Sequence, residues 1–407
     1  MKSTKLDFLF FLSAGFFILA KYMELSTLHA MLAWLPALLK VVRYASYALI
    51  ILVTIFLTGH TRKALLRYIL FLFLFLVISV KADSVTILFN FFFIFAAKDY
   101  PKEKLMKFVV TLQIVIMTLV VLGCFMGYLD DWIYWQGERV RHSLGYGYPN
   151  ALPTIYFYVV LTVCYLLRKR FTFLHFVVFE ILNYIIFVYT DTRTAFILTA
   201  LALLVFLFLR VYRRSLSNNS WHRLIYVHSV WILALIAILA CYFYNPGNVV
   251  WNRVNDIISN RLSLGHNALL INPLTLFGQK IQWYGFGGYG YTFMEMEGEY
   301  NYVDCSYVKI LLDNGIIMLA LAVLGYSFAA NEELKNGNRY FCVALLFANV
   351  YSMIESRYIT LGFNPFVWCL SSLIRNDVYI SNKAGPRLRI HSFSPQRGKP
   401  VQQTLEM

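Results

Sequence analysis

The chain is organised around residues 245–303, which read NPGNVVWNRVNDIISNRLSLGHNALLINPLTLFGQKIQWYGFGGYGYTFMEMEGEYNYV. This is the one long stretch that is neither apolar throughout nor a short basic turn between apolar runs. Loops of this length are uncommon in compact domains, and those rich in charged and aromatic side chains carry function more often than they serve as linkers. We therefore expect a working site here, with the rest of the chain as its scaffold.

The composition places most of the chain in hydrocarbon. Of the 407 residues, 59% are hydrophobic and only 14% are charged, and the mean hydropathy is +0.61. Soluble globular domains are less apolar and carry more charge. The predicted fold class is therefore all-α, a polytopic membrane protein.

Apolar runs near the roughly 20 residues that a helix needs to cross a bilayer predict about twelve spans within residues 1–375. The predicted spans lie near 6–20, 41–59, 65–81, 84–97, 104–128, 149–167, 172–190, 194–212, 223–244, 305–329, 339–354 and 359–374. The long loop would then connect helices 9 and 10. The segment from Leu28 to Leu39 contains Pro36, and it is either an interfacial piece or an extension of the second span.

Clusters of lysine and arginine predict the orientation of these spans. If the spans alternate, most clusters fall on one side, and an excess of positive charge is typical of cytoplasmic loops. We expect a multi-pass protein of the cytoplasmic (inner) membrane, with both termini cytoplasmic and residues 376–407 forming a basic, disordered tail. The exceptions to the charge rule are Lys21, Lys40, Arg43 and Lys81. The outer face would carry residues 130–148, 190–194, 245–303 and 355–358.

Several classes of site are excluded or disfavoured by the residues. The net charge of +15 does not indicate a nucleic-acid partner, because the basic residues sit in short clusters between apolar runs. The six cysteines show no CxxC spacing and no accompanying histidines, so neither a zinc site nor a disulfide framework is indicated. Dense carboxylate sets, a P-loop and a GxSxG motif are also missing from the sequence. We predict no metal and no cofactor.

The first polar cluster of the outer face is GERVRHSLGYGYPN, residues 137–150. Arg139 and Arg141 precede two glycines and Pro149, which begins a span. Glycines permit close backbone approach, and a proline at a helix start leaves free N–H groups, an arrangement that suits an anionic ligand. The alternative is that the two arginines only face water or lipid headgroups.

The second cluster is the turn YTDTRT, residues 189–194, which is short enough to hold its charges at the membrane boundary. Charges at that depth are costly, so they usually form pairs or bind a ligand. Asp191 and Arg193 either form a structural ion pair, or Arg193 contacts a phosphate.

The long loop contains a predicted amphipathic helix, VVWNRVNDIISNR, residues 249–261. Its valines and isoleucines recur at helical spacing, and Arg261 lies at its end, so we expect it to lie on the outer surface. Further along the loop, we expect the flat aromatic rings of four residues to stack against sugar rings, namely Trp283, Tyr284, Tyr289 and Tyr291.

Two residues are candidate general bases. His266 can take a proton from a hydroxyl nucleophile, although a lone interfacial histidine is more often only a polar tip. Glu355, in the sequence IESR, is the rival candidate, and its alternative role is a plain ion pair with Arg357. Several outer arginines together with one His or Glu fit a site that binds a pyrophosphate and activates a hydroxyl.

The order of these motifs resembles that of the Wzy-type oligosaccharide repeat-unit polymerases and the related O-antigen ligases of bacterial envelopes. The stretches that carry the resemblance lie within residues 130–370 and read RHSLGYGYPN, TDTRTAF, NRLSLGHNAL, WYGFGGYGY and VDCSYVKILLDNGIIMLAL. Cys305 and Ser306 depart from a stretch that often reads Asp-Asn-x-Tyr in the family, whereas Asp304 and Tyr307 match it.

The resemblance implies a GT-C-like architecture and a metal-independent glycosyltransferase without a cofactor. Such an enzyme polymerises undecaprenyl-pyrophosphate-linked repeat units into capsule, O-antigen or exopolysaccharide on the outer face of the membrane. Its implied partners are these lipid-linked oligosaccharides, the bilayer, and flippase and chain-length regulator proteins. The implied pyrophosphate contacts are Arg139 or Arg141, Arg193 and Arg261, with Asp191 beside them, and His266 would activate the acceptor.

Other functions stay open at this point. A flippase of lipid-linked oligosaccharides or another transporter would place ionisable residues at mid-membrane depth and would need no long outer loop, which is the reverse of this chain. An O-antigen ligase would need a lipid A-core acceptor, which no motif identifies. A sensor or structural protein would tolerate replacement of the outer arginines.

Overall fold

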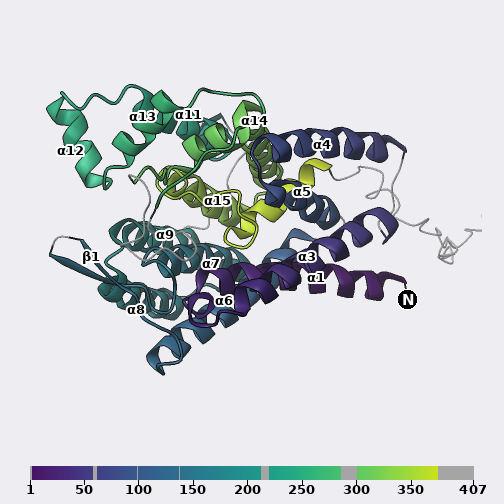
Figure 1. Cartoon of the computed structure of the whole chain (residues 1–407), viewed down its shortest axis with the longest axis horizontal. Coiled ribbons are helices and arrows are strands. Elements are labelled where there is room, and N and C mark those ends of the chain that lie inside the picture. Colours follow the sequence, from purple (N-terminus) through teal and green to yellow (C-terminus); the bar gives the residue numbers. More distant parts are fainter. Residues whose placement is uncertain are drawn as a thin grey trace, which may run out of the picture. The chain divides into compact units, whose positions relative to one another are not determined.

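The computed structural model describes residues 2–57, 62–98, 100–136, 138–211, 220–285 and 300–374 (Figure 1). Within these ranges nearly all regular structure is helical, and the strands form one two-stranded sheet. The predicted class, an all-α polytopic membrane protein, fits this architecture. Three features predicted from the sequence lie outside the described residues, namely the basic tail at 376–407, Tyr289 and Tyr291.

The elements follow one another along the chain with short connections, except after α13. In order they are α1 (Lys2–Leu25), α2 (Leu28–Met31), α3 (Leu35–Leu52), η1 (Val53–Leu57), α4 (Arg62–Lys81), α5 (Val85–Ala97), α6 (Lys102–Phe125), β1 (Ile133–Gln136), β2 (Arg139–His142), α7 (Ala151–Leu167), η2 (Arg168–Arg170), α8 (Phe173–Thr190), α9 (Arg193–Val211), α10 (Ser220–His222), η3 (Arg223–Val227), α11 (Ser229–Tyr242), α12 (Val249–Ile257), α13 (Arg261–Ile271), α14 (Ser306–Lys335), α15 (Arg339–Tyr351) and η4 (Pro365–Ile374).

Seven helices of the described ranges are long and apolar enough to cross a membrane. An eighth is added if Ser220–Val227 and Ser229–Tyr242, which meet at a bend of 54°, form one span. Each predicted span overlaps a helical segment, but the count of about twelve is not confirmed. The helices α5 and α15 have 13 residues each, and η4 is a 3-10 helix of 10 residues. The apolar runs of the sequence therefore located the helices without fixing which of them span.

The helices divide into a central group and a peripheral group. In the candidate span Ala151–Arg170, which contains α7, 78% of the apolar segment is buried inside the protein. The helix α7 packs against α6, α8, α9 and α15. In α8, only 11% of the corresponding segment is buried. A helix that is apolar on every side belongs either inside a protein or in contact with lipid. The centre of the bundle is thus α7 with α15, and α8 turns most of its surface outward.

A network of buried tyrosines and asparagines fixes the loop between α15 and η4. The Tyr326 hydroxyl donates to the carbonyl of Tyr358 at 3.0 Å, and Asn364 Nδ2 donates to the same oxygen at 2.7 Å. Tyr358 in turn donates to Asn349 Oδ1, and the Tyr307 hydroxyl donates to the Asn349 carbonyl at 2.9 Å. Buried polar groups are costly unless they are hydrogen-bonded, so a satisfied network of this kind holds the loop in one conformation.

The loop that follows α13 crosses α14 at a break in that helix. Gly315 interrupts α14 with φ +86°, and Gly278 of the loop has φ +85°. The Ile316 N–H donates to the Thr275 carbonyl at 3.0 Å, so the loop backbone satisfies a group that the break exposes. A Cβ on Gly278 would lie 2.2 Å from the Asp313 carbonyl oxygen. The two backbones are therefore in direct contact, and only glycine fits at the crossing.

We expect Gly278→Ala to lower the free energy of unfolding by about 3 kcal/mol, because it combines a strained φ with a clash against backbone atoms. Thermal or steric-trap unfolding of the purified protein measures the loss. The matched control is Gly337→Ala, since Gly337 has φ +67° but no atom within 4 Å of its built Cβ. That variant should lose only the strain, about 1 kcal/mol. Equal losses in the two variants would show that the crossing is not tightly packed.

Candidate functional site

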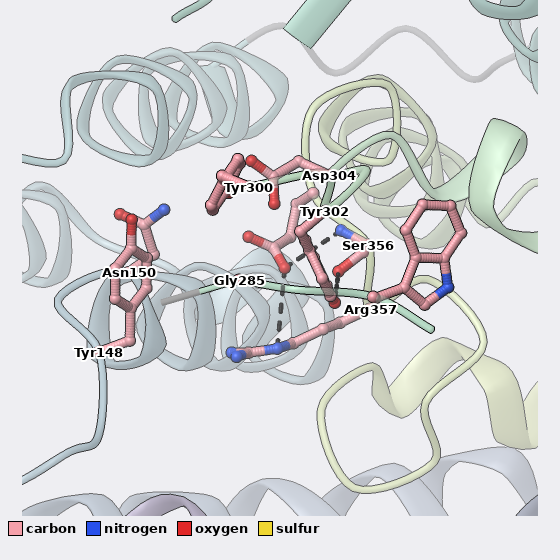
Figure 2. A pocket seen from close by; sticks show the side chains of 10 residues that line it. Tyr148, Asn150, Gly285, Tyr300, Tyr302, Asp304, Ser356 and Arg357 are labelled. Carbon is pink, nitrogen blue, oxygen red and sulfur yellow. Dashed lines mark hydrogen bonds and ion pairs between the residues drawn. The ribbon is translucent and has the colours of Figure 1, made fainter. Parts of the chain in front are cut away.

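A cavity of about 130 Å³ lies where three distant parts of the chain meet (Figure 2). One part precedes α7, one belongs to the long loop, and one connects α15 to η4. The lining residues are, part by part, Tyr148 and Asn150; Trp283, Gly285, Tyr300, Tyr302 and Asp304; and Glu355, Ser356 and Arg357. The part of the long loop that the structure describes thus forms one wall of the cavity, through Trp283, Gly285, Tyr300 and Tyr302.

Glu355 is a buried carboxylate in the cavity wall, 7% exposed. The Thr154 hydroxyl donates to its Oε2 at 3.2 Å, and the Tyr351 hydroxyl lies 2.9 Å from Thr154 Oγ1. Its Oε1 accepts from the Ser356 N–H at 3.1 Å and lies 3.7 Å from Arg357 Nε. Burial raises the pKa of Glu355 above its ordinary value, although Arg357 acts in the opposite direction. Glu355 therefore takes up a proton more readily than an exposed glutamate.

Arg357 places positive charge in the cavity. Its side chain extends toward Tyr148 (Figure 2), and its guanidinium lies 4.3 Å from the ring centroid of Phe363. The Nη1 atom is buried and has no hydrogen-bond partner among the described residues. Leaving a buried donor unpaired costs free energy, and a bound anion would satisfy it with a charge-assisted hydrogen bond. The guanidinium is thus a candidate anion-binding group.

Arg261 acts on the cavity through Asp304. Its Nε lies 3.4 Å from Asp304 Oδ2, and its Nη1 donates to the Ile258 carbonyl at 3.2 Å. Burial raises the pKa of Asp304, while Arg261 and Arg357 oppose that rise. Arg261, a predicted pyrophosphate contact, therefore does not line the cavity. It lies behind Asp304, which does, and partly neutralises the charge of that carboxylate.

Ser306 joins two walls of the cavity. Its N–H donates to the Ser352 carbonyl at 2.9 Å, and its hydroxyl donates to the Glu355 carbonyl. The same hydroxyl accepts from the Tyr358 N–H at 3.1 Å. The start of α14, directly after Asp304, is thereby fixed to the loop that carries Glu355.

An aromatic wall is held in place by an ion pair on α14. The Trp283 indole N–H donates to Asp313 Oδ1 at 2.8 Å, and Lys309 Nζ lies 3.0 Å from Asp313 Oδ2. The Lys309 ammonium is also 4.2 Å from the Trp283 ring centroid and 4.7 Å from that of Tyr302. Trp283 was predicted as a flat face and lines the cavity, whereas Tyr284 does not line it. The spacing of Lys309 and Asp313, one helical turn apart, was the available signal for this support.

The first two predicted clusters meet each other beside the cavity. Arg139 Nε pairs with Asp191 Oδ2, and Arg139 Nη2 donates to the Asp191 carbonyl at 2.6 Å. Arg193 Nε lies 3.5 Å from Asp191 Oδ1, and its side chain is 67% exposed. The alternative in which Asp191 and Arg193 form an ion pair is therefore present in the structure, with Arg139 as the closer partner of Asp191.

Arg141 connects that cluster to the cavity. It is buried, its Nε donates to the Thr190 carbonyl at 2.9 Å, and its Nη2 donates to Thr192 Oγ1 at 3.1 Å. Nη2 also donates to Asn150, and the guanidinium lies 5.8 Å from the ring centroid of Tyr148. Since Asn150 and Tyr148 line the cavity, Arg141 supports its wall from behind.

His266 lies apart from the cavity. It is on α13, where its Nδ1 is 3.0 Å from the Cys241 carbonyl oxygen and its ring meets the ring of Tyr244 at 5.7 Å. Both partners belong to the end of α11 and the residues just after it. Of the two predicted general bases, the structure brings Glu355 into the cavity and gives His266 a packing contact between two helices.

The groups available for chemistry are two carboxylates, one guanidinium and an aromatic wall. In the described part of the chain, no three His, Cys, Asp or Glu side chains gather in a way that could hold a metal ion. Asp304 and Glu355 come from different segments, and each has an arginine within ion-pair distance. This arrangement can accept a proton and bind an anion in one cavity, through groups that are largely buried.

Comparison with known proteins gives no match. No protein-family model, curated protein or solved structure matches this chain. The resemblance to Wzy-type polymerases is therefore a hypothesis carried by the order of the motifs, and the cavity is the independent basis for a function.

The raised pKa of Glu355 predicts a pH dependence of stability. Protonated Glu355 adds to the free energy of unfolding, and this contribution is fully present below the pKa that Glu355 has in the unfolded chain. It is lost as the pH rises through the raised pKa that Glu355 has in the folded protein. Glu355→Gln mimics the protonated form and should not show this loss. We expect wild type to lose about 1.4 kcal/mol relative to Glu355→Gln for each unit by which the pKa is raised.

Unfolding midpoints of the two proteins, measured from acid to neutral pH, test this prediction. Glu138→Gln serves as the control, because Glu138 is exposed at the tip of the hairpin. Its curve should run parallel to that of wild type. If the Glu355→Gln curve is also parallel, the pKa of Glu355 is not raised.

Proposed function

We propose that this chain is a membrane glycosyltransferase that polymerises oligosaccharides carried on a polyprenyl pyrophosphate, with the cavity as its active site. The observation that carries the proposal is the meeting, in one cavity, of buried Glu355 with the unpartnered Nη1 of Arg357. The apolar helices and the motif order of the sequence support it further.

Glu355 is the proposed general base. The acceptor sugar's hydroxyl would lose its proton to the Glu355 carboxylate as its oxygen attacks the anomeric carbon of the donor. A base works best when its pKa lies near the operating pH, and burial moves the pKa of Glu355 in that direction. The hydrogen bonds from Thr154 and from the Ser356 N–H keep the carboxylate in place for this step.

Arg357 is the proposed contact for the leaving group. The bond between the donor's anomeric carbon and the phosphate oxygen breaks, and the lipid pyrophosphate departs with one more negative charge. A donor directed at that charge in a water-poor space stabilises the transition state more than the ground state. Arg261 and Arg141 lie behind the walls and add positive potential without lining the cavity.

Trp283 and Tyr302 are the proposed sugar-binding faces. Both rings line the cavity, and the Lys309–Asp313 pair fixes the orientation of Trp283. A rigid aromatic ring offers a large apolar face at a small cost in side-chain entropy. The proposal therefore retains the polymerase predicted from the sequence, moves the base from His266 to Glu355, and adds Arg357 to the contacts.

We expect Glu355→Gln and Arg357→Gln each to lower the polymerisation rate about a hundredfold or more, because each removes a group that acts in the transition state. Membranes from cells lacking the chain, complemented with each variant at equal protein levels, would receive lipid-linked repeat units. The readout is the glycan ladder on electrophoresis. Arg253→Gln is the matched control, since Arg253 lies exposed on α12, and it should keep the wild-type rate.

His266→Gln separates the two predicted bases. Glutamine keeps a donor for the Cys241 carbonyl, so we expect a rate within a few-fold of wild type. A ladder that survives Glu355→Gln but disappears in His266→Gln would reverse the assignment. Repeat units that accumulate on the cytoplasmic side in cells lacking the chain would instead support the transporter alternative and contradict the polymerase.

The rate should rise with pH through the raised pKa of Glu355, because the base must be deprotonated to act. Thr154→Val removes a hydrogen bond to the charged carboxylate, so this rise should move to higher pH. Thr154→Ser keeps the hydroxyl and should restore the wild-type profile. A profile that is unchanged in Thr154→Val would show that Glu355 is not the titrating base.

A further inference from the structure

The two faces of the β1–β2 hairpin differ in chemistry. The strands are antiparallel with Ile133 opposite His142, Tyr134 opposite Arg141 and Trp135 opposite Val140. Opposed residues point to the same side of a two-stranded sheet and alternate residues point to opposite sides. One face therefore carries Tyr134, Arg139 and Arg141, and the other carries Ile133, Trp135, Val140 and His142.

The arginine face is turned toward the protein. Arg141 binds Thr190, the last residue of α8, and Arg139 binds Asp191, the residue after it. The Tyr134 hydroxyl donates to the Gly147 carbonyl at 2.6 Å. Because these bonds hold the hairpin against the end of α8, the hairpin lies along the protein. Its opposite face must then point away from the protein.

On the opposite face, Ile133, Trp135 and Val140 are apolar and exposed, while His142 at its base pairs with Asp131. Trp135 is 67% exposed, Ile133 is 50% exposed and Val140 is 38% exposed. Large apolar groups grouped on one side of a small element mark a binding surface more often than single exposed residues do. Among the residues that the structure describes, no other element covers these three side chains.

The apolar face is continuous with the exposed ends of two candidate spans. At its base the His142 ring meets Tyr189 of α8 at 5.9 Å, and Tyr189 meets Phe125 of α6 at 5.8 Å. Phe125 is 58% exposed, and α8 is the least buried of the candidate spans. The exposed ends of α6 and α8 are thus linked through Tyr189 to His142, the residue opposite Ile133 in the hairpin.

We infer that the β1–β2 hairpin is embedded in the lipid interface, with the apolar face of Ile133, Trp135 and Val140 in contact with the bilayer around α6 and α8. This holds whether or not the chain is a glycosyltransferase. The depth follows from the backbone: a two-stranded sheet has two open edges, and their N–H and C=O groups need water. The hairpin therefore stays at headgroup depth, where tryptophan is enriched, and does not enter the bilayer centre.

The consequence is a fixed depth for two arginines. Because Arg139 and Arg141 occupy the other face of the same strands, a hairpin seated in the interface holds them at headgroup depth, with Arg141 buried against Thr190 and Arg139 paired with Asp191. Figure 1 shows β1 at the end of the bundle away from the labelled N-terminus, on the same side as α12. The exposed side chains of Val249, Val250, Val254 and Ile257 make α12 a second apolar element at that end.

Spin labels on the hairpin test the inference. Labels at Ile133→Cys, Trp135→Cys and Val140→Cys, each in a Cys124→Ser background because the other five cysteines are buried, would be read in nanodiscs. We expect them to be more accessible to oxygen, which partitions into lipid, than to a water-soluble nickel chelate. Glu138→Cys at the exposed tip should show the reverse preference. Chelate accessibility at all four positions would place the hairpin in water and overturn the inference.

Labels that are immobile and reached by neither probe would also overturn it, since a protein surface would then cover the face. A substitution within the face gives a second readout. Trp135→Glu should lower the ratio of oxygen to chelate accessibility at Val140→Cys several-fold, because a carboxylate at that position draws the face toward water. Trp135→Leu keeps an apolar group and should leave the ratio unchanged. An equal ratio in the two backgrounds contradicts lipid contact.

Discussion

The hydroxyl of Ser306 is the interaction on which the cavity depends. It donates to the carbonyl of Glu355 and accepts from the N–H of Tyr358, so one side chain ties the start of α14 to both ends of the neighbouring turn. Asp304 lies two residues before it. The separation of the two carboxylates is therefore set by a single buried contact, and the surrounding tyrosine and asparagine network keeps the turn from relaxing. Ser306 is also one of the two positions at which the sequence departs from the pattern of the family it resembles.

The sequence predicted the helical class well because a run of apolar residues long enough to fill a bilayer leaves few other conformations. It did not predict which helices span. The segments α5 and α15 are apolar enough, but they are short, and α15 is buried within the protein. Hydropathy reports a preference for leaving water, and both the protein interior and the lipid satisfy that preference. Composition therefore cannot distinguish a helix that spans the membrane from one that is buried in the protein, and the expected count of spans depends on that distinction.

The candidate site was predictable in its parts more than in its arrangement. The outer clusters were found from charge and glycine content, and Glu355 was already a candidate base. Their partners were not found, because Thr154 and Tyr351 are ordinary residues of apolar helices until the fold brings them to a carboxylate. His266 shows the converse: a reactive side chain from the long loop lies on α13, apart from the cavity, and contacts the Cys241 carbonyl and the Tyr244 ring. Reactivity is a property of the residue, whereas burial and neighbours come only from the fold.

The crossing of Gly278 and Gly315 makes the loop and the helix depend on each other. The loop precedes α14 in the sequence, yet its backbone bonds the part of α14 that follows the break. Without the docked loop, the N–H groups of Ile316 and Ile317 would lose the partners that they have at the break, and unsatisfied groups are costly away from water. The bonds at the break therefore need the loop and the part of α14 after Gly315 to be present together.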